Sequence, residues 1–327
     1  MMKRTLIQVL AVTTVAAFAF SASAQTNLRF GHYGAPSDAV TKAAEKFKSL
    51  VEEKTGGSVT VTLYPGSSLG NSTAMVQGAR MGTIDMACTG NPYFTSFAPV
   101  MNVIDLPFLF VNEGHVEKVM DGPIGRELLD KLDQYKLKGL ALWEIGFRDL
   151  TNNARPVSKP ADLKGLKIRT TPNPAHVQAF EMLGANPTPM PFSEVYLALE
   201  TGIVDGQENP VHHIYANRLQ EVQKYMSLTH HAYTASPVVM NLSKFNRLTA
   251  AEQKAILEAA VEAAKFDRSL NKGLNDESLE LIKKAGVEVI ENPDSAAFRA
   301  IVADATRASY VKEHGSAILD KIVAAGK

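Results

Sequence analysis

The segment of this chain that is most informative about its fold runs from Leu166-Lys167-Ile168-Arg169 to Ile203-Val204-Asp205-Gly206. Both ends of the segment read as short strands. Between them lie an apolar helical pattern near 174–183, a proline-rich connector at 185–191 and a second helical stretch at 192–200. This alternation of strands and helices predicts an α/β fold.

The N-terminal part repeats the alternation. The pattern predicts strands and helices at 28–31, 40–51, 59–64, 71–82 and 84–88. Asp38 precedes the first helix and is a suitable N-cap residue. The strand–helix–strand order predicts a mainly parallel sheet here too.

Later segments indicate that the chain returns to its first half. Strand-like runs near 225–230 and 237–242 are followed by the longest helical pattern, from Thr249 to Gly286, which is long enough to bridge two lobes. We therefore expect a two-lobed α/β protein with a ligand cleft between the lobes. The predicted division is 25–146 plus about 236–275 for lobe 1, and 147–235 plus about 276–327 for lobe 2.

Residues 1–24 have the organisation of a signal peptide. Lys3 and Arg4 precede the mostly apolar run 6–20, and Ala22-Ser23-Ala24 forms a cleavage pattern before Gln25. The alternative is a membrane anchor, but the apolar run is shorter than the about 20 residues that a spanning helix needs. We expect cleavage after residue 24 and a mature protein outside the cytoplasmic membrane.

Composition excludes several classes of function. Lys plus Arg and Asp plus Glu both total 34, so the formal net charge is zero and we expect no nucleic-acid partner. Cys88 is the single cysteine, which excludes an intrachain disulfide and a cysteine-rich metal site.

The strongest enzymatic signal is Gly66-Ser67-Ser68-Leu69-Gly70, a G-x-S-x-G pattern between a predicted strand and a helix. A serine hydrolase using Ser68 is one reading, and an ordinary turn before a helix is the other. The pairs His212-His213 and His230-His231 are poor chelates because adjacent side chains diverge. We predict no metal and no cofactor.

Two arginines are candidates for binding a carboxylate. Arg169 ends a predicted strand, on the face opposite Leu166 and Ile168, and ligands of α/β sheets bind beyond the carboxyl ends of strands. Arg148 lies near the predicted lobe junction, where Asp149 could neutralise it. A guanidinium presents a planar fork of donors that matches both oxygens of a carboxylate.

One long motif carries a family resemblance. The run from Pro189-Met190-Pro191-Phe192 to Leu199, followed by Val204-Asp205-Gly206-Gln207-Glu208-Asn209-Pro210, resembles the signature of periplasmic solute-binding proteins of TRAP transporters, the DctP type. The runs Leu63-Tyr64-Pro65, Asp105-Leu106-Pro107-Phe108 and Gly165–Arg169 fall in the family's order. The resemblance covers essentially the whole mature chain.

The resemblance implies a non-enzymatic protein that closes around an organic acid and delivers it to the TRAP membrane permease subunits. It implies that Arg169 forms the salt bridge with the ligand carboxylate, that Arg148 and Asn209 contact the ligand, and that Phe192 lines the pocket. A ligand-sensing partner of a membrane receptor would have the same pocket. We expect a monomer.

The predicted first lobe departs from the sialic-acid-binding members of the family. Tyr33 stands where those members have an asparagine contact, so a different ligand is expected. Tyr33 and Asn91 are our candidates for shaping the pocket from this lobe. Further candidates are His32, Tyr93 and Trp143.

Overall fold

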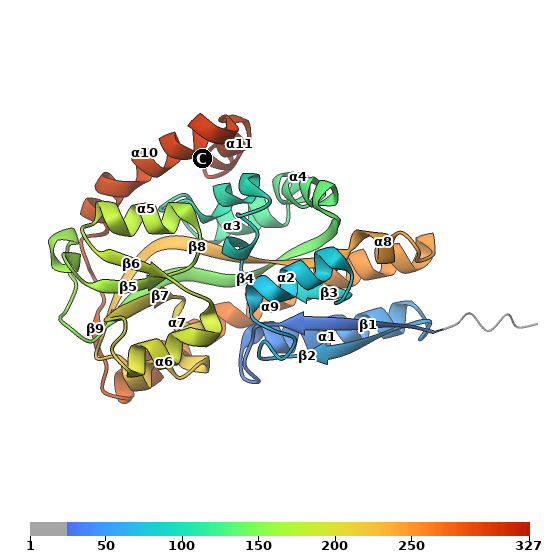
Figure 1. Ribbon diagram of the computed structural model, residues 1–327, viewed down its shortest axis with the longest axis horizontal. Coiled ribbons are helices and arrows are strands. Elements are labelled where there is room, and N and C mark those ends of the chain that lie inside the picture. The colour runs from blue at the N-terminus through green and yellow to red at the C-terminus, as the bar shows by residue number, and fades with distance from the viewer. Residues whose placement is uncertain (1–24) are drawn as a thin grey trace, which may run out of the picture.

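The computed structural model describes residues 25–327, and Figure 1 traces them from the N-terminal strand to the C-terminal helices. The predicted signal peptide, residues 1–24, lies outside the described residues. Within the described part of the chain, no helix has the length and apolar character needed to cross a membrane.

A nine-stranded sheet extends through the described residues, with the order β2-β1-β3-β8-β4-β7-β5-β6 and with β9 paired to β8. The strands are β1 (Thr26–His32), β2 (Val59–Tyr64), β3 (Met86–Cys88), β4 (Leu137–Asn152), β5 (Lys167–Thr170), β6 (Asn186–Pro189), β7 (Gly206–Asn209), β8 (Tyr225–Asn241) and β9 (Glu288–Ile290).

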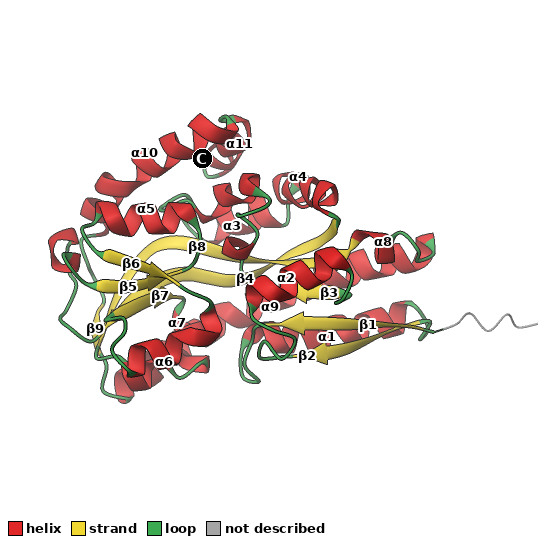
Figure 2. Ribbon diagram, viewed as in Figure 1, coloured by secondary structure: helices red, strands yellow, loops and turns green. Residues whose placement is uncertain are grey.

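Helices cover both faces of this sheet (Figure 2). The α-helices are α1 (Ala39–Lys54), α2 (Ser72–Met81), α3 (Glu113–Met120), α4 (Pro123–Asp130), α5 (Pro174–Met182), α6 (Val195–Glu200), α7 (Val211–Ala216), α8 (Leu242–Phe245), α9 (Ala250–Lys284), α10 (Ser295–His314) and α11 (Ala317–Ala325). The 3-10 turns that bear on the site are η1 (Asn91–Tyr93), η2 (Pro99–Asp105) and η5 (Phe192–Glu194).

The two ends of the sheet form two lobes. We call the end with β1, β2, β3, α1 and α2 the first lobe, and the end with β5, β6, β7, α5, α6 and α7 the second lobe (Figure 1). The long strands β4 and β8 pair with each other and run through both lobes. The lobes therefore share one hydrogen-bonded sheet.

The sheet as a whole is mixed, although the parallel pairing predicted for the N-terminal part is confirmed by β1 with β2 and β1 with β3. The pairs within each lobe are parallel, as the strand–helix alternation predicts. The pairs that involve the central strands, β3 with β8, β4 with β8 and β4 with β7, are antiparallel. Alternation along the chain describes only neighbouring elements, and it does not report how distant strands cross the middle of the sheet.

The N-terminal elements match their sequence patterns. The predicted strand 59–64 is β2, and the apolar helix positions Val40, Phe47 and Val51 are buried on α1. Asn71 caps α2, because its side-chain oxygen accepts a hydrogen bond from the backbone nitrogen of Ala74 at 3.0 Å. Periodicity therefore located these elements to within a few residues.

The proline-rich connector at 185–191 contains a strand, so the expectation of a turn is wrong for Asn186–Pro189. This strand, β6, pairs in parallel with β5, and Pro187 lies opposite Ile168. β6 is at the edge of the sheet, where only one side needs hydrogen bonds, and proline is tolerated there because its missing N–H can face away from the neighbour. The predicted strand at 203–206 is displaced to β7, Gly206–Asn209.

The predicted lobe borders, after residues 146 and 235, fall within the two long strands. Gly146 pairs with Thr234, and Glu144 pairs with Ala235. The register shifts between Glu144 and Gly146, and Gly146 has φ +121°, a conformation that L side chains rarely adopt. The two borders, distant in sequence, thus lie side by side at an irregularity in the sheet.

The long helix predicted after Thr249 is α9. Thr249 and Glu252 form a capping box at its start, which satisfies backbone donors that the first turn leaves without partners. α9 packs against α1 and β4, and farther along against α7 of the second lobe. It therefore bridges the two lobes, as its length suggested.

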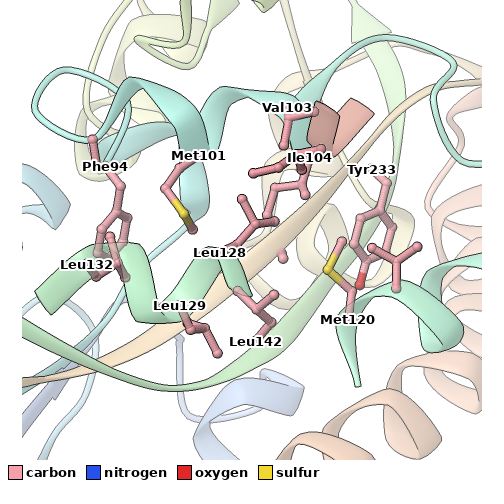
Figure 3. Packing of buried hydrophobic residues seen from close by; sticks show 14 of the residues in the cluster. Phe94, Met101, Val103, Ile104, Met120, Leu128, Leu129, Leu132, Leu142 and Tyr233 are labelled. Carbon is pink, nitrogen blue, oxygen red and sulfur yellow. The ribbon is translucent and has the colours of Figure 1, made fainter. Parts of the chain in front are cut away.

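The largest described hydrophobic cluster lies beneath α3 and α4. Figure 3 shows Met101, Leu128 and Leu142 packing toward one another, and all three are almost fully buried. Tyr233 of β8 belongs to the same cluster. This packing attaches the segment after β3 to the central strands and so fixes where η1 meets the second lobe.

Candidate functional site

A small cavity lies between the two lobes, and residues from both lobes line it. Its volume is about 20 Å³, close to the space that one water molecule occupies. Every residue of the predicted ligand site except Asn91 lines this cavity: Tyr33, Arg148, Arg169, Phe192 and Asn209. The fold thus brings together residues that are far apart in the sequence.

Asn91 lies away from the cavity. Its side chain is buried and donates hydrogen bonds to Met101 O at 2.8 Å and to Asp105 Oδ2 at 2.6 Å. Asn173 donates to the same carboxylate oxygen at 2.7 Å. Burial raises the pKa of Asp105 to about 8. In this position, Asn91 links η1 to η2, and it is not among the residues that line the cavity.

Of the three further candidates from the first lobe, only one lines the cavity. Tyr93 lines the cavity. Trp143 packs edge-on against Phe30 and Phe47 and donates its indole N–H to Ala260 O of α9 at 3.0 Å. His32 is fully buried and outside the cavity lining. The sequence pattern could not distinguish these positions because all of them are aromatic residues in or near strands.

Arg169 is a buried cation without an acidic partner among the described residues. It is 1% exposed, and its guanidinium donates to Met190 O at 2.8 Å and to Tyr93 Oη at 3.2 Å. Burial lowers the pKa of Arg169. No described residue accepts a hydrogen bond from Nη1 of Arg169. The Arg169 side chain lines the cavity. A buried charge normally requires a counter-charge, so this arrangement favours an anion.

Arg148 is, by contrast, already neutralised. Its Nε and Nη2 donate to the carboxylate of Glu208, and both side chains are essentially inaccessible. Burial pushes the pKa of Glu208 up, but the charge of Arg148 and the hydrogen bond with the His231 ring, among other nearby groups, together hold that pKa well below its usual range. Glu208 was not predicted as a site residue, although it lies within the quoted motif.

Asp149 does not neutralise Arg148, because successive residues of a strand point to opposite faces. Asp149 instead accepts hydrogen bonds from the backbone nitrogen of His230 and from its ring, at 3.0 and 2.8 Å. Arg148 is turned toward the cavity, where it also donates to Thr234 Oγ1 at 3.2 Å.

Asn209 and Phe192 complete the second-lobe side of the cavity. Asn209 Oδ1 accepts from Arg148 Nη2 at 2.9 Å, and its amide nitrogen donates to Gln207 Oε1 at 2.6 Å. The centroid of the Phe192 ring lies 6.0 Å from the guanidinium carbon of Arg169 and 4.5 Å from the centroid of the His213 ring. Phe192 thus lies between two polar groups of the site, and its ring packs on the His213 ring.

His213 is a second residue of the site that the sequence did not single out. It lines the cavity from α7, and its Nδ1 lies 2.7 Å from Oδ2 of Asp38, which precedes α1 in the first lobe. Burial alone would raise the pKa of Asp38. The charge of His213 and the hydrogen bond to its ring act in the opposite direction, and the pKa is lower than its usual value. The only sequence signal was the histidine pair at 212–213.

Ser68 does not have the surroundings of a catalytic nucleophile. It is exposed on a turn in which Gly66, Ser67 and Gly70 all have positive φ. Among the described residues, no histidine or carboxylate hydrogen-bonds to its hydroxyl. The G-x-S-x-G pattern is therefore the turn that leads into α2. Within residues 25–327, no group of His, Cys, Asp and Glu side chains has the arrangement of a metal site.

Comparison with known proteins agrees with this architecture. The family model of the bacterial extracellular solute-binding protein family 7 (DctP) matches residues 30–313. The chain is 44% identical over 310 residues to the 2,3-diketo-L-gulonate-binding periplasmic protein YiaO of Escherichia coli, covering 95% of this chain and 94% of that protein.

Solved structures of similar proteins share the fold. A TRAP periplasmic solute-binding protein from Polaromonas sp. JS666 bound to D-erythronate has a TM-score of 0.89 at 35% identity, covering 92% of this chain and 99% of that one. The sugar acid binding protein DctPAm from Advenella mimigardefordensis in complex with galactonate has a TM-score of 0.87 at 33% identity, with the same coverage.

These matches extend over nearly the whole described chain and include its two-lobed sheet. They come from proteins that bind solutes, which excludes the serine hydrolase alternative. The chain belongs to the bacterial extracellular solute-binding protein family 7, the DctP-type binding proteins of TRAP transporters.

Proposed function

We propose that this protein captures an organic acid in the cavity between its lobes and passes it, chemically unchanged, to the membrane subunits of a TRAP transporter. Arg169 carries the proposal, because it is a buried guanidinium that lines the cavity and has no acidic partner among the described residues. A ligand carboxylate would supply the missing counter-charge and accept a charge-assisted hydrogen bond from Nη1, the guanidinium nitrogen without an acceptor among the described residues.

Arg148 and Asn209 have a different role in this proposal. Glu208 already balances the charge of Arg148, so Arg148 contributes hydrogen bonds and holds Asn209 in place through the 2.9 Å contact between them. Asn209 then contacts the carboxylate region. Because Glu208 balances Arg148, Arg169 leaves one net positive charge at the site. This charge suits a ligand that presents a single carboxylate to Arg169.

The ligands named for similar proteins support the class. 2,3-Diketo-L-gulonate, D-erythronate and galactonate are all sugar acids with one carboxylate. The periplasmic location is supported by the predicted signal peptide and by the extracellular family.

Binding requires the lobes to move, since a sugar acid is far larger than a cavity of about 20 Å³. We propose that the lobes separate by bending β4 and β8 near Gly146, admit the acid and close around it. Contacts such as Arg169–Tyr93 span the cavity, so the closed state makes interactions that the open state lacks. A ligand that touches both lobes shifts the population toward closure.

The test is titration calorimetry with a panel of carboxylic acids, using the wild type, Arg169→Ala and Arg169→Lys. Removing one partner of a buried, hydrogen-bonded ion pair costs about 2–5 kcal/mol, so Arg169→Ala should weaken binding by well over tenfold. Arg169→Lys keeps the charge but loses the planar fork, and it should also weaken binding.

Arg247→Lys is the matched control, because Arg247 is exposed and distant from the cavity lining. It should bind like the wild type. Unchanged affinity in both Arg169 variants, or recovery of a chemically altered acid by mass spectrometry, would contradict the proposed function.

A further inference from the structure

The pair formed by Asp38 and His213 joins the two lobes at the edge of the cavity. The distance from Asp38 Oδ2 to His213 Nδ1 is 2.7 Å, and the side chains are 6% and 4% exposed. Asp38 occupies the N-cap position of α1, yet its side chain makes no cap hydrogen bond there. An aspartate at this position normally caps the helix. Here its carboxylate is directed to His213 instead.

The imidazole of His213 is held in one orientation. The Phe192 ring lies at 4.5 Å and 32° to it, and the Tyr33 ring meets it edge-on at 5.4 Å. Asn217 donates to the Asp38 carboxylate at 3.4 Å and so supports the acceptor. Since Nδ1 is turned toward Asp38, Nε2 is at the other side of the ring. No described residue hydrogen-bonds to Nε2, and His213 lines the cavity.

From this geometry we propose that His213 Nε2 recognises a hydroxyl group of the ligand, with Asp38 as the residue that positions the ring. The inference rests on the proposed function, because it concerns the far end of an acid whose carboxylate is at Arg169. It assigns the protein to hydroxylated acids rather than to unsubstituted fatty acids.

The chemistry of the ring selects a hydroxyl. Asp38 accepts the Nδ1 proton, so Nε2 is a hydrogen-bond acceptor in the neutral ring and a donor in the charged ring. A hydroxyl can both donate and accept, and it therefore fits Nε2 in either state. A methylene group at the same place would leave the nitrogen desolvated without a partner, which is costly.

Phe192 connects the two poles of the site. Its ring centroid lies 6.0 Å from the Arg169 guanidinium carbon and 4.5 Å from the centroid of the His213 ring. The carbon chain of the acid can therefore pack on Phe192 while the carboxylate is at one polar group and the hydroxyl at the other. Amphipathic hydroxy acids, which have an apolar edge between two polar ends, match this arrangement.

The experiment compares acids of equal chain length by titration calorimetry: D-erythronate with butanoate, and galactonate with hexanoate. The wild type should bind at least one hydroxylated acid about tenfold or more tightly than its unhydroxylated counterpart. His213→Leu should lose most of this preference by weakening the hydroxylated acid, while affinity for the unhydroxylated acid changes by less than about twofold.

His212→Leu is the matched control. His212 is the adjacent buried histidine, it contacts Ser278 Oγ at 3.0 Å, and it does not line the cavity. It should preserve the ratio between the two acids. Asp38→Asn should reduce the ratio, and ¹⁵N NMR of the His213 ring should show a changed distribution of the proton between Nδ1 and Nε2.

The outcomes separate the two proposals. Equal weakening of both acids in His213→Leu would mean that the residue only stabilises closure, and it would overturn the hydroxyl assignment. A wild type that binds both acids of each pair equally, or prefers the unhydroxylated one, would overturn it as well and leave carboxylate binding standing. A wild type that binds none of the carboxylic acids would overturn the proposed function itself.

Discussion

Tyr93 Oη accepts a hydrogen bond from Arg169 Nη2 at 3.2 Å and another from the backbone nitrogen of Phe192 at 3.1 Å. Tyr93 belongs to η1, which follows β3 of the first lobe, whereas Arg169 and Phe192 belong to the second lobe. One phenol oxygen therefore joins the lobes at the residue that we propose for carboxylate binding.

Tyr93→Phe tests this junction. The variant removes one acceptor of the buried Arg169 guanidinium and the acceptor of the half-buried backbone nitrogen of Phe192, and the loss of a partner costs a buried donor about 1–3 kcal/mol. We expect ligand affinity to fall by about tenfold or more in titration calorimetry. Tyr64→Phe, at the end of β2 and outside the cavity lining, is the control. Wild-type affinity in Tyr93→Phe would show that this bond does not support closure.

Glu208→Gln tests the charge balance at Arg148. Removing one partner of a buried ion pair leaves an uncompensated charge, so the free energy of unfolding should fall by about 3 kcal/mol in urea denaturation. The pKa of Glu208 is lowered when folded, so its stabilisation is complete above the unfolded value of about 4.3 and is lost only as the pH falls.

The stability difference between Glu208→Gln and the wild type should therefore be constant from about pH 5.5 to pH 8. The exposed Glu200→Gln is the matched control and should unfold like the wild type. A difference that disappears at neutral pH would argue against an ionised Glu208.

The pH dependence of stability should carry the signature of buried neutral histidines. Burial lowers the pKa of His32 and of His176 to about 4. In the unfolded chain these groups titrate near 6.5, so between about pH 6.5 and pH 4 the unfolded state binds more protons. The free energy of unfolding should therefore decrease as the pH falls, by up to about 1.4 kcal/mol per pH unit for each group.

His32→Leu should make this decrease less steep. Neither ring nitrogen of His32 has a hydrogen-bond partner within the described residues, so the apolar side chain removes a titrating group and sacrifices no hydrogen bond. Urea denaturation at about pH 7, 6 and 5 measures the slope. The same slope in the variant and the wild type would mean that His32 is not the acid-sensitive group.

Gly206→Ala tests how tightly β7 is placed against β4. A Cβ at this position would overlap the carbonyl oxygen of Thr151 and lie 2.8 Å from Asn152 Cβ. The start of β7 would have to move, and overpacking of this kind typically costs about 1–3 kcal/mol. We expect lower stability in urea denaturation and weaker ligand binding, because Glu208 and Asn209 follow on the same strand.

Gly273→Ala is the contrasting glycine variant. A Cβ at Gly273 meets nothing within 4 Å, and the residue is inside α9, where alanine is favoured over glycine by about 1 kcal/mol. It should be as stable as the wild type or more so. Destabilisation by Gly273→Ala as large as that by Gly206→Ala would mean that the crowding at β7 is not the cause.

Local patterns located the elements of each lobe, because apolar period and turn residues act over a few positions. They did not locate β4 or the full length of β8. In these strands glycine, serine and proline interrupt the apolar run, as at Gly139, Gly146 and Pro237, and pairing between distant segments holds them extended. β6 was missed for a related reason, since Pro187 and Pro189 read as a turn without knowledge of the sheet edge.

The same limit applies to the site. The motif placed Arg169, Phe192 and Asn209 near one another, and the structure finds them around one cavity. The partner of His213 could not be inferred from the sequence, because Asp38 is 175 residues away. An aspartate directly before a helix is also already explained as an N-cap residue. Contacts between the lobes do not change the local spacing of apolar residues, so this spacing cannot predict them.

The two strands that run the length of the sheet also determine what can be separated. Because β4 and β8 each contribute residues to both lobes, residues 25–327 contain no linker between the lobes at which a protease could release an intact half. A cut between the lobes would divide both β4 and β8 and so break the central ladder. Exchanging a single lobe with a relative would therefore require a redesigned β4–β8 ladder, and changes of ligand preference are more readily made by side-chain substitution than by recombination.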